Sequence, residues 1–314
     1  MSEPLESDPS LLVVVLDVNA SSWAKSPLTV GNALQQMVIF INAYLALKSE
    51  NGLAVLACNR RECRCLYPPS RASPAIERDI RVYEQFRVVD ARVLAGVQAM
   101  LSGAEDIVGD PNKGIEECQT PMSQALSKAL CHIHRVSEST SAKVWPRILV
   151  LSAADDSPRE YIALMNTIFA AQRMGVLIDI CKVFGRDSVF LQQAAEITGG
   201  NYLKVDTAGH ESMLQTLMFT CLADHYTREI LVSPTKEMID FRATCFCHKR
   251  VVDIGYVCSV CLSIFCQVAP ICSTCQTKFS FRIVRADSAQ INGNLKGSPR
   301  SGAATVAMST LSLA

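Results

Sequence analysis

Apolar runs and helically spaced apolar residues alternate along the first two thirds of the chain. Residues 11–16, LLVVVL, form a continuous run rich in β-branched side chains, which is typical of a central strand covered on both faces. A helix is predicted next, from the spacing of Leu34, Met37, Val38, Ile41, Tyr44 and Leu45. The stretches GLAVLACN and CRCLYP, separated by RRE, predict a hairpin that ends at Pro68 and Pro69.

Beyond the hairpin the pattern predicts helices that alternate with strands. Helices are expected over about 76–102, 122–136, REYIALMNTIFAAQRMG, SVFLQQAAEI and 210–224, and strands at RILVLS, VLIDICKVF and NYLKV. Gly175 and the pair Gly199 and Gly200 stand at predicted helix ends, because glycine accepts the left-handed conformation that caps a C-terminus. This order predicts an α/β fold with a doubly wound, mostly parallel six-stranded sheet.

The carboxyl end of the first predicted strand is a candidate binding site. Ligands of such sheets bind at the carboxyl ends of the strands, near the point where the strand order reverses. Asp17 falls there, in the stretch LDVNASS, with Asn19 and Ser21 at alternate positions after it. Oxygen ligands placed in this way can hold a divalent cation.

Composition bounds the class of protein. The chain has 314 residues, of which 49% are hydrophobic and 19% charged, enough for one large domain and a small one. Its 30 basic and 30 acidic side chains cancel, so no global charge attracts nucleic acid or an anionic membrane. MSEPLESDPS lacks the features of a signal peptide, no apolar run approaches about 18 residues, and 14 cysteines indicate a reducing compartment. A soluble intracellular protein is expected.

The texture of the sequence changes at Pro234. Seven of the 14 cysteines lie between Cys245 and Cys275, and the residues from about 287 on are small, polar and without period. We predict five segments in chain order: a disordered N-terminus (1–9), the sheet domain (10–228), a linker (229–243), a zinc-binding module (244–283) and a disordered tail (284–314).

Four cysteines carry the most specific chemistry in the chain. Cys258 and Cys261 form one Cys-x-x-Cys pair, and Cys272 and Cys275 form another. Each pair can turn two thiolates towards one point, and four thiolates satisfy tetrahedral zinc. The spacing therefore predicts a structural zinc ion in a small ribbon-like or RING-like module.

A further group of metal-ligating side chains remains beside this site. Cys245, Cys247, His248 and Cys266 are candidates for a second zinc ion, which would give a cross-braced arrangement like that of a RING finger. In cross-brace order Cys266 needs a partner about three residues on, where Ala269 stands instead. Whether the module binds one zinc ion or two stays open at this point.

The Asp-x-Asn-x-Ser loop, the element order and the stretch AAEITGGNYLKV together resemble a von Willebrand A domain. In that family a magnesium site is completed by a threonine from a second loop and an aspartate after the fourth strand. The resemblance assigns the threonine to Thr120 and places Ala153 or Ala154 where the aspartate belongs, with Asp155 and Asp156 coming late. Asp17, Ser21 and Thr120 are therefore interpreted as the remnant of a cation site, without a bound magnesium ion.

An A domain followed by CFCHKRVVDIGYVCSVCLSIFC and CSTC is similar to one family, the smaller A-domain core subunits of TFIIH, the general transcription and DNA repair factor. The resemblance implies a nuclear, non-catalytic, zinc-binding subunit of a hetero-oligomer, which binds the larger A-domain subunit and other core subunits. It would support RNA polymerase II initiation and nucleotide excision repair, with at most weak or indirect contact with nucleic acid. A RING-type ubiquitin ligase and a direct DNA-binding zinc protein are the alternatives.

Overall fold

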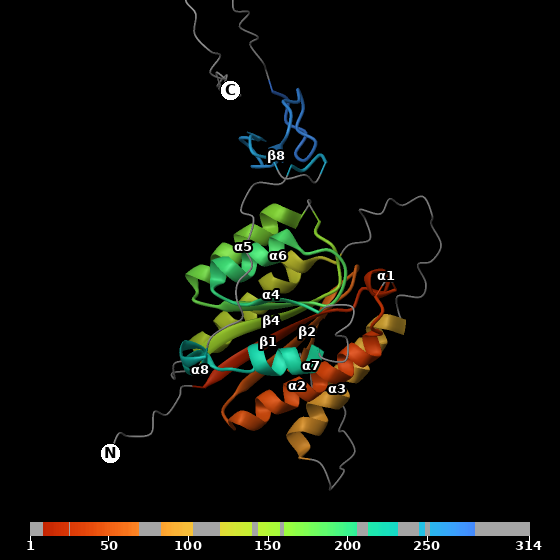
Figure 1. The fold of residues 1–314 in the computed structure, drawn as a ribbon, viewed down its shortest axis with the longest axis vertical. Helices are drawn as coiled ribbons and strands as arrows, with labels where there is room; N and C mark the ends of the chain where they lie inside the picture. The colour runs from red at the N-terminus through yellow and green to blue at the C-terminus, as the bar shows by residue number, and fades with distance from the viewer. Residues whose placement is uncertain are drawn as a thin grey trace, which may run out of the picture. The chain divides into compact units, whose positions relative to one another are not determined.

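The computed structural model describes residues 9–24, 26–68, 83–102, 120–139, 144–157, 160–205, 213–231, 245–248 and 252–279. The chain divides into two compact units, Met1–Phe241 and Arg242–Ala314 (Figure 1). The predicted linker and the two predicted disordered segments lie largely outside the described residues. The last described helix of the first unit, α8 (His225–Ile230), runs past the predicted domain end at residue 228.

One six-stranded sheet forms the centre of the first unit. Its strands are β1 (Ser10–Asp17), β2 (Gly52–Cys58), β3 (Cys63–Tyr67), β4 (Trp145–Ser152), β5 (Leu177–Lys182) and β6 (Tyr202–Lys204). Their order is β3-β2-β1-β4-β5-β6, and every pair is parallel except β2 with β3. This confirms the predicted von Willebrand A-like, doubly wound sheet. The strand order reverses between β1 and β4, and Asp17 is the last residue of β1.

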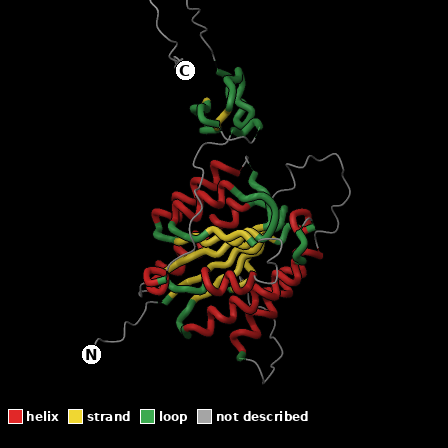
Figure 2. The backbone as a smooth tube through the Cα atoms, viewed as in Figure 1, coloured by secondary structure: helices red, strands yellow, loops and turns green. Residues whose placement is uncertain are grey.

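Helices cover both faces of this sheet, as Figures 1 and 2 show. One face bears α2 (Val30–Leu47), α3 (Glu84–Ser102) and α7 (Met213–Thr220), and the other bears α4 (Met122–Ser139), α5 (Tyr161–Arg173) and α6 (Val189–Thr198). Alternate residues of β1 enter the two cores, with Leu12 and Val14 on one side and Val13 and Val15 on the other. Because both faces are buried, β1 is apolar at every position from Leu11 to Leu16.

The last described part of the first unit differs from the prediction, because the helix expected over 210–224 ends early and a second helix follows it. Helix α7 ends at Thr220, and α8 begins after Asp224, whose carboxylate accepts a hydrogen bond from the amide of Thr227 at 2.9 Å. Arg147 is buried on β4 and donates hydrogen bonds of 2.6–3.2 Å to the carbonyl groups of residues 221–223. The guanidinium satisfies these carbonyls, so the chain can turn there.

Other boundaries also differ from the sequence prediction. The short helix α1 (Ala20–Trp23) was not predicted, and the part of the helix expected at 76–82 lies outside the described residues. The glycine helix ends are confirmed, since Gly175 and Gly199 have φ values of +66° and +77°. A side chain at Gly200 would place its Cβ 2.0 Å from the carbonyl oxygen of Ile178, so only glycine fits against β5.

Helix α2 is, by length and composition, the one helix among the described residues that could cross a membrane. Its face made of Met37, Phe40, Ile41 and Tyr44 is at most 1% exposed and packs on the sheet. A core helix of a globular domain has this same composition.

The second unit contains a short antiparallel ribbon, β7 (Tyr256–Val257) with β8 (Ile264–Phe265). Its buried core consists of Cys258, Phe265 and Cys272, with Phe246 and Phe279 packed against them. Three buried residues remove little apolar surface from water, so this core is too small to hold the unit folded without further cross-links.

Candidate metal centres

The carboxylate of Asp17 lies at the carboxyl end of β1, where the sequence predicts the remnant cation site. Its side chain is 1% exposed, and both of its oxygens accept hydrogen bonds. Oδ1 accepts from the hydroxyl of Thr120 at 2.8 Å and from the amide of Asn19 at 3.1 Å. Oδ2 accepts from the amides of Ala153 and Ala154 at 3.2 and 2.9 Å. Four protein donors thus take up the lone pairs that a cation would need.

The first loop is held by Asn19. Asn19 caps α1, and its Oδ1 accepts hydrogen bonds from the amide of Ser21 at 3.4 Å and from the hydroxyl of Ser21 at 3.0 Å. The indole of Trp23 donates to the carbonyl of Asp17 at 2.6 Å. The helix cap is therefore Asn19, and Ser21 supports the loop from its exposed side.

The loop after β4 places its late aspartate elsewhere. The carboxylate of Asp156 accepts hydrogen bonds from the hydroxyl of Ser188 and from the amide of Phe190, at the N-terminus of α6. Asp156 therefore faces α6, as its offset from the family position predicts. In its stead the loop presents the two backbone amides of Ala153 and Ala154 to Asp17.

A buried ammonium group supplies positive charge at this end of the sheet. Lys182, the last residue of β5, is 0% exposed, and its Nζ donates a hydrogen bond to the carbonyl of Ala154. Burial lowers the pKa of Lys182, while the carboxylates of Asp155, Asp156 and Asp17 raise it. Burial also raises the pKa of Asp17, against the effect of its hydrogen bonds. The lysine offsets the acidic charge that a magnesium ion would offset in an intact site.

We predict that the chain binds no magnesium at Asp17. Calorimetric titration of the full chain with Mg²⁺ should show no saturable binding tighter than about 1 mM, since the cation would have to displace four hydrogen bonds and share the site with Lys182. The same titration of Asp17→Ala serves as the blank. Saturable micromolar binding that Asp17→Ala abolishes would show instead that the cation site is intact.

The four cysteines of the predicted zinc site converge in the second unit. The ligand atoms of Cys258, Cys261, Cys272 and Cys275 all lie within 4.8 Å of one another. Sγ of Cys258 is 3.7 Å from Sγ of Cys275, and Sγ of Cys261 is 3.6 Å from Sγ of Cys272. Zinc–sulfur bonds of about 2.3 Å in a tetrahedron separate the sulfurs by about 3.8 Å. The cluster therefore has the dimensions of a four-thiolate zinc site.

The two halves of this site have the same local structure. In each half, the carbonyl of the first cysteine accepts a hydrogen bond from the backbone amide four residues later. Leu262 donates to Cys258 and Gln276 donates to Cys272, both at 2.9 Å. Leu262 and Gln276, each following the second cysteine of its pair, have φ values of +59° and +61°. The left-handed residue closes each tight turn and points both sulfurs to one side.

Two hydroxyl groups that contact the cysteine sulfurs were not predicted from the sequence, although an internal repeat in the sequence indicates them. Ser263 places its hydroxyl 3.1 Å from Sγ of Cys261, and Thr277 places its hydroxyl 3.0 Å from Sγ of Cys275. The hydrogen bonds from Thr277 lower the pKa of the Cys275 thiol to about 6, which favours the thiolate form that binds metal. The segments CSVCLSIF and CSTCQTKF are an internal repeat, Cys-Ser-x-Cys-x-Ser/Thr-x-Phe, that predicts this equivalence.

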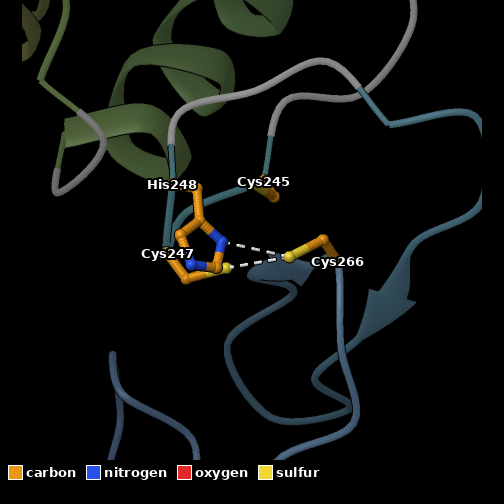
Figure 3. A group of neighbouring side chains, drawn as sticks. All are labelled: Cys245, Cys247, His248 and Cys266. Atoms are coloured by element: carbon orange, nitrogen blue, oxygen red, sulfur yellow. Dashed lines mark hydrogen bonds between the residues drawn. The ribbon is translucent and has the colours of Figure 1, made fainter.

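The remaining candidates, Cys245, Cys247, His248 and Cys266, also lie together, as Figure 3 shows. Their ligand atoms are within 4.8 Å of one another. Sγ of Cys266 is 3.5 Å from Sγ of Cys247 and 3.2 Å from Nδ1 of His248. Among the described residues, these two clusters are the groups of His, Cys, Asp and Glu that could hold a metal ion.

Comparison with known proteins identifies the family. The sequence model of the family described as transcription factor Tfb4 matches residues 9–276, which include the sheet domain, Asp17 and both clusters. The chain belongs to the Tfb4 family.

Members of the Tfb4 family with related sequences occur in distant organisms. The General transcription and DNA repair factor IIH subunit tfb4 of Schizosaccharomyces pombe is 40% identical over 287 residues, which are 89% of this chain and 92% of that protein. The subunit TFB4 of Arabidopsis thaliana is 36% identical over 286 residues, 88% of this chain and 91% of that protein. The crystal structure of the TFIIH p34 N-terminal domain is 29% identical, with a TM-score of 0.55, and the match covers 68% of this chain and 97% of that domain.

Proposed function

We propose that this chain is the Tfb4 subunit of a nuclear TFIIH complex and acts there without catalysis, by holding other subunits in place. Its main partner would be the larger A-domain subunit, and through the complex it would serve RNA polymerase II initiation and nucleotide excision repair. The observation that carries the proposal is the family match over residues 9–276, together with relatives that are themselves named as factor IIH subunits.

The state of the sheet domain supports a scaffolding role. The carboxylate at the strand-order reversal is saturated by four protein donors, so it is not available as a base or as a cation ligand. A partner at this edge would be held by side-chain contacts and not by a metal-bridged carboxylate.

The small unit offers a surface suited to such contacts. Six of its aliphatic side chains are 39–75% exposed, with Ile254, Val260 and Leu262 above 60%. The others are Val257, Val268 and Ile271. Exposed apolar groups at this density on a small module are typical of a surface that a partner covers. We propose that the larger A-domain subunit covers these residues, which the zinc-bound turns hold in fixed positions.

Affinity purification tests the proposal. A tagged chain should recover the larger A-domain subunit from nuclear extract in equal amount, and co-expression of the two should raise the soluble yield of this chain. The double variant Leu262→Asp and Val260→Asp should reduce recovery of the larger A-domain subunit. The control Gln267→Asp changes an exposed polar residue of the same unit and should leave this recovery unchanged. A chain that purifies alone and conjugates ubiquitin with an E2 enzyme would show that the class is wrong.

A further inference from the structure

The two metal-ligating clusters are interleaved along the chain. The first three ligands, Cys245, Cys247 and His248, belong to the outer cluster, and the next two, Cys258 and Cys261, belong to the inner one. Cys266 then returns to the outer cluster, and Cys272 and Cys275 complete the inner one. This alternation is the connectivity of a cross-brace, in which neither cluster can form from a continuous piece of chain.

We propose that Cys245, Cys247, His248 and Cys266 bind a second zinc ion, so that the small unit is a cross-braced two-zinc module. In the outer site, three ligands come from the turn of residues 245–248 and the fourth is Cys266. The sequence argument against a second site rested on Ala269, which stands where Cys266 would find a partner. The structure removes that objection, because Cys247 and His248 both take part and one turn supplies three of the four ligands. The proposal does not depend on membership of a complex.

The geometry of the outer cluster matches the chemistry of zinc. Three thiolates and one imidazole make a closed tetrahedral donor set, with zinc–nitrogen bonds of about 2.0–2.1 Å and zinc–sulfur bonds of about 2.3 Å. Such a site separates two neighbouring sulfurs by about 3.8 Å, and a sulfur from the imidazole nitrogen by about 3.6 Å. The observed separations of Cys266 from Cys247 and His248, 3.5 and 3.2 Å, approach these values within a few tenths of an ångström. The side chains of Cys247 and His248 point towards Cys266 in Figure 3.

The outer metal would join two segments of the small unit that are distant in sequence. The turn of residues 245–248 reaches the ribbon through the amide of Phe246, which donates to the carbonyl of Ile264 at 2.8 Å. Cys266 follows β8 directly, so a metal ion between it and the turn fastens the start of the unit to the end of the ribbon. Loss of this ion should free the turn and leave the inner site assembled.

The two sites should also differ in how fast they lose metal. Cys258 and Cys272 of the inner site are each 1% exposed, whereas Cys247 and His248 of the outer site are exposed to solvent. A chelator reaches exposed ligands first. Zinc should therefore leave the full chain in two steps of equal size, the faster one from the outer site.

Metal analysis of the full chain, alone or co-purified with its partner, tests the inference. The wild-type chain should contain two zinc ions, and the chelating dye 4-(2-pyridylazo)resorcinol should withdraw them in two phases. Cys266→Ser should contain one zinc ion and lose the fast phase, and Cys131→Ser, at an exposed cysteine of α4, should keep both. One zinc ion in the wild type, unchanged in Cys266→Ser, would overturn the proposal.

Substitution at His248 separates metal binding from a merely structural role. His248→Cys supplies a fourth thiolate and should keep two zinc ions, whereas His248→Ala leaves three ligands and should release the fast zinc at a lower chelator concentration. Cobalt exchanged into the wild type should show thiolate charge-transfer absorption from seven sulfurs, and in Cys266→Ser it should fall to about four sevenths of that intensity. Equal zinc retention by His248→Ala and His248→Cys would show that the imidazole is not a ligand.

Discussion

Replacing Cys261 by serine is expected to unfold the small C-terminal unit and to leave the sheet domain folded. Among the described residues of this unit, the buried hydrophobic cluster consists of Cys258, Phe265 and Cys272, which is too few to offset the conformational entropy of the folded chain. We expect a zinc ion at the inner site to supply the stability, since closed thiolate sites bind zinc with about 10–16 kcal/mol. Serine is a far weaker zinc ligand, so most of this free energy is lost.

Limited proteolysis shows the effect most directly. Cleavage of the Cys261→Ser chain should spread through residues 245–279, while the sheet domain stays resistant and keeps its unfolding transition. Because Cys266 lies between the two inner pairs, on the segment that unfolds with the inner site, this variant should lose all of its zinc, whereas Cys266→Ser should free only the turn of residues 245–248. Cys131→Ser should behave like the wild type. A protected C-terminal unit in Cys261→Ser would show that packing alone holds it.

Replacing Lys182 by methionine is expected to destabilise the sheet domain by about 1–3 kcal/mol, the usual cost of leaving a buried polar group without its partner. Lys182 is 0% exposed, and the carboxylates that act on it include that of Asp17, which is 1% exposed. Methionine has a similar shape but carries no charge. It would also leave the carbonyl of Ala154 without the hydrogen bond that Lys182 donates.

Lys204→Met provides the matched control. Lys204 lies on the neighbouring strand β6 and pairs with Asp187 at 3.0 Å, but both side chains are more than a third exposed. Such a surface pair contributes about 0–1 kcal/mol. Urea unfolding of the two variants should thus give clearly different midpoints at the same slope. Equal midpoints would show that the charge of Lys182 does not compensate the acidic groups of this site.

Local sequence patterns determined the architecture of this protein. The run LLVVVL predicted a strand buried on both faces because every position is apolar, and the glycines marked helix ends because their conformation is a property of single residues. The turns of the two Cys-x-x-Cys pairs could also be predicted from the sequence, since each turn forms within a few residues. The position of Asp17 was also predicted, because this residue directly follows the apolar run of β1, next to the point where the strand order reverses.

The tertiary structure decided what fills the sites. Asp17 accepts hydrogen bonds from Thr120, 103 residues away, and from backbone amides 136 and 137 residues away. Any residue except proline can supply a backbone amide, so a sequence pattern cannot predict such donors. The break between α7 and α8 depends on Arg147, which lies on a distant strand. The outer cluster joins Cys266 to a turn 18 and 19 residues earlier, which supplies the ligands that the sequence lacks near Ala269. Local patterns fix the elements, whereas contacts between distant residues, which depend on how the elements pack, fix the chemistry.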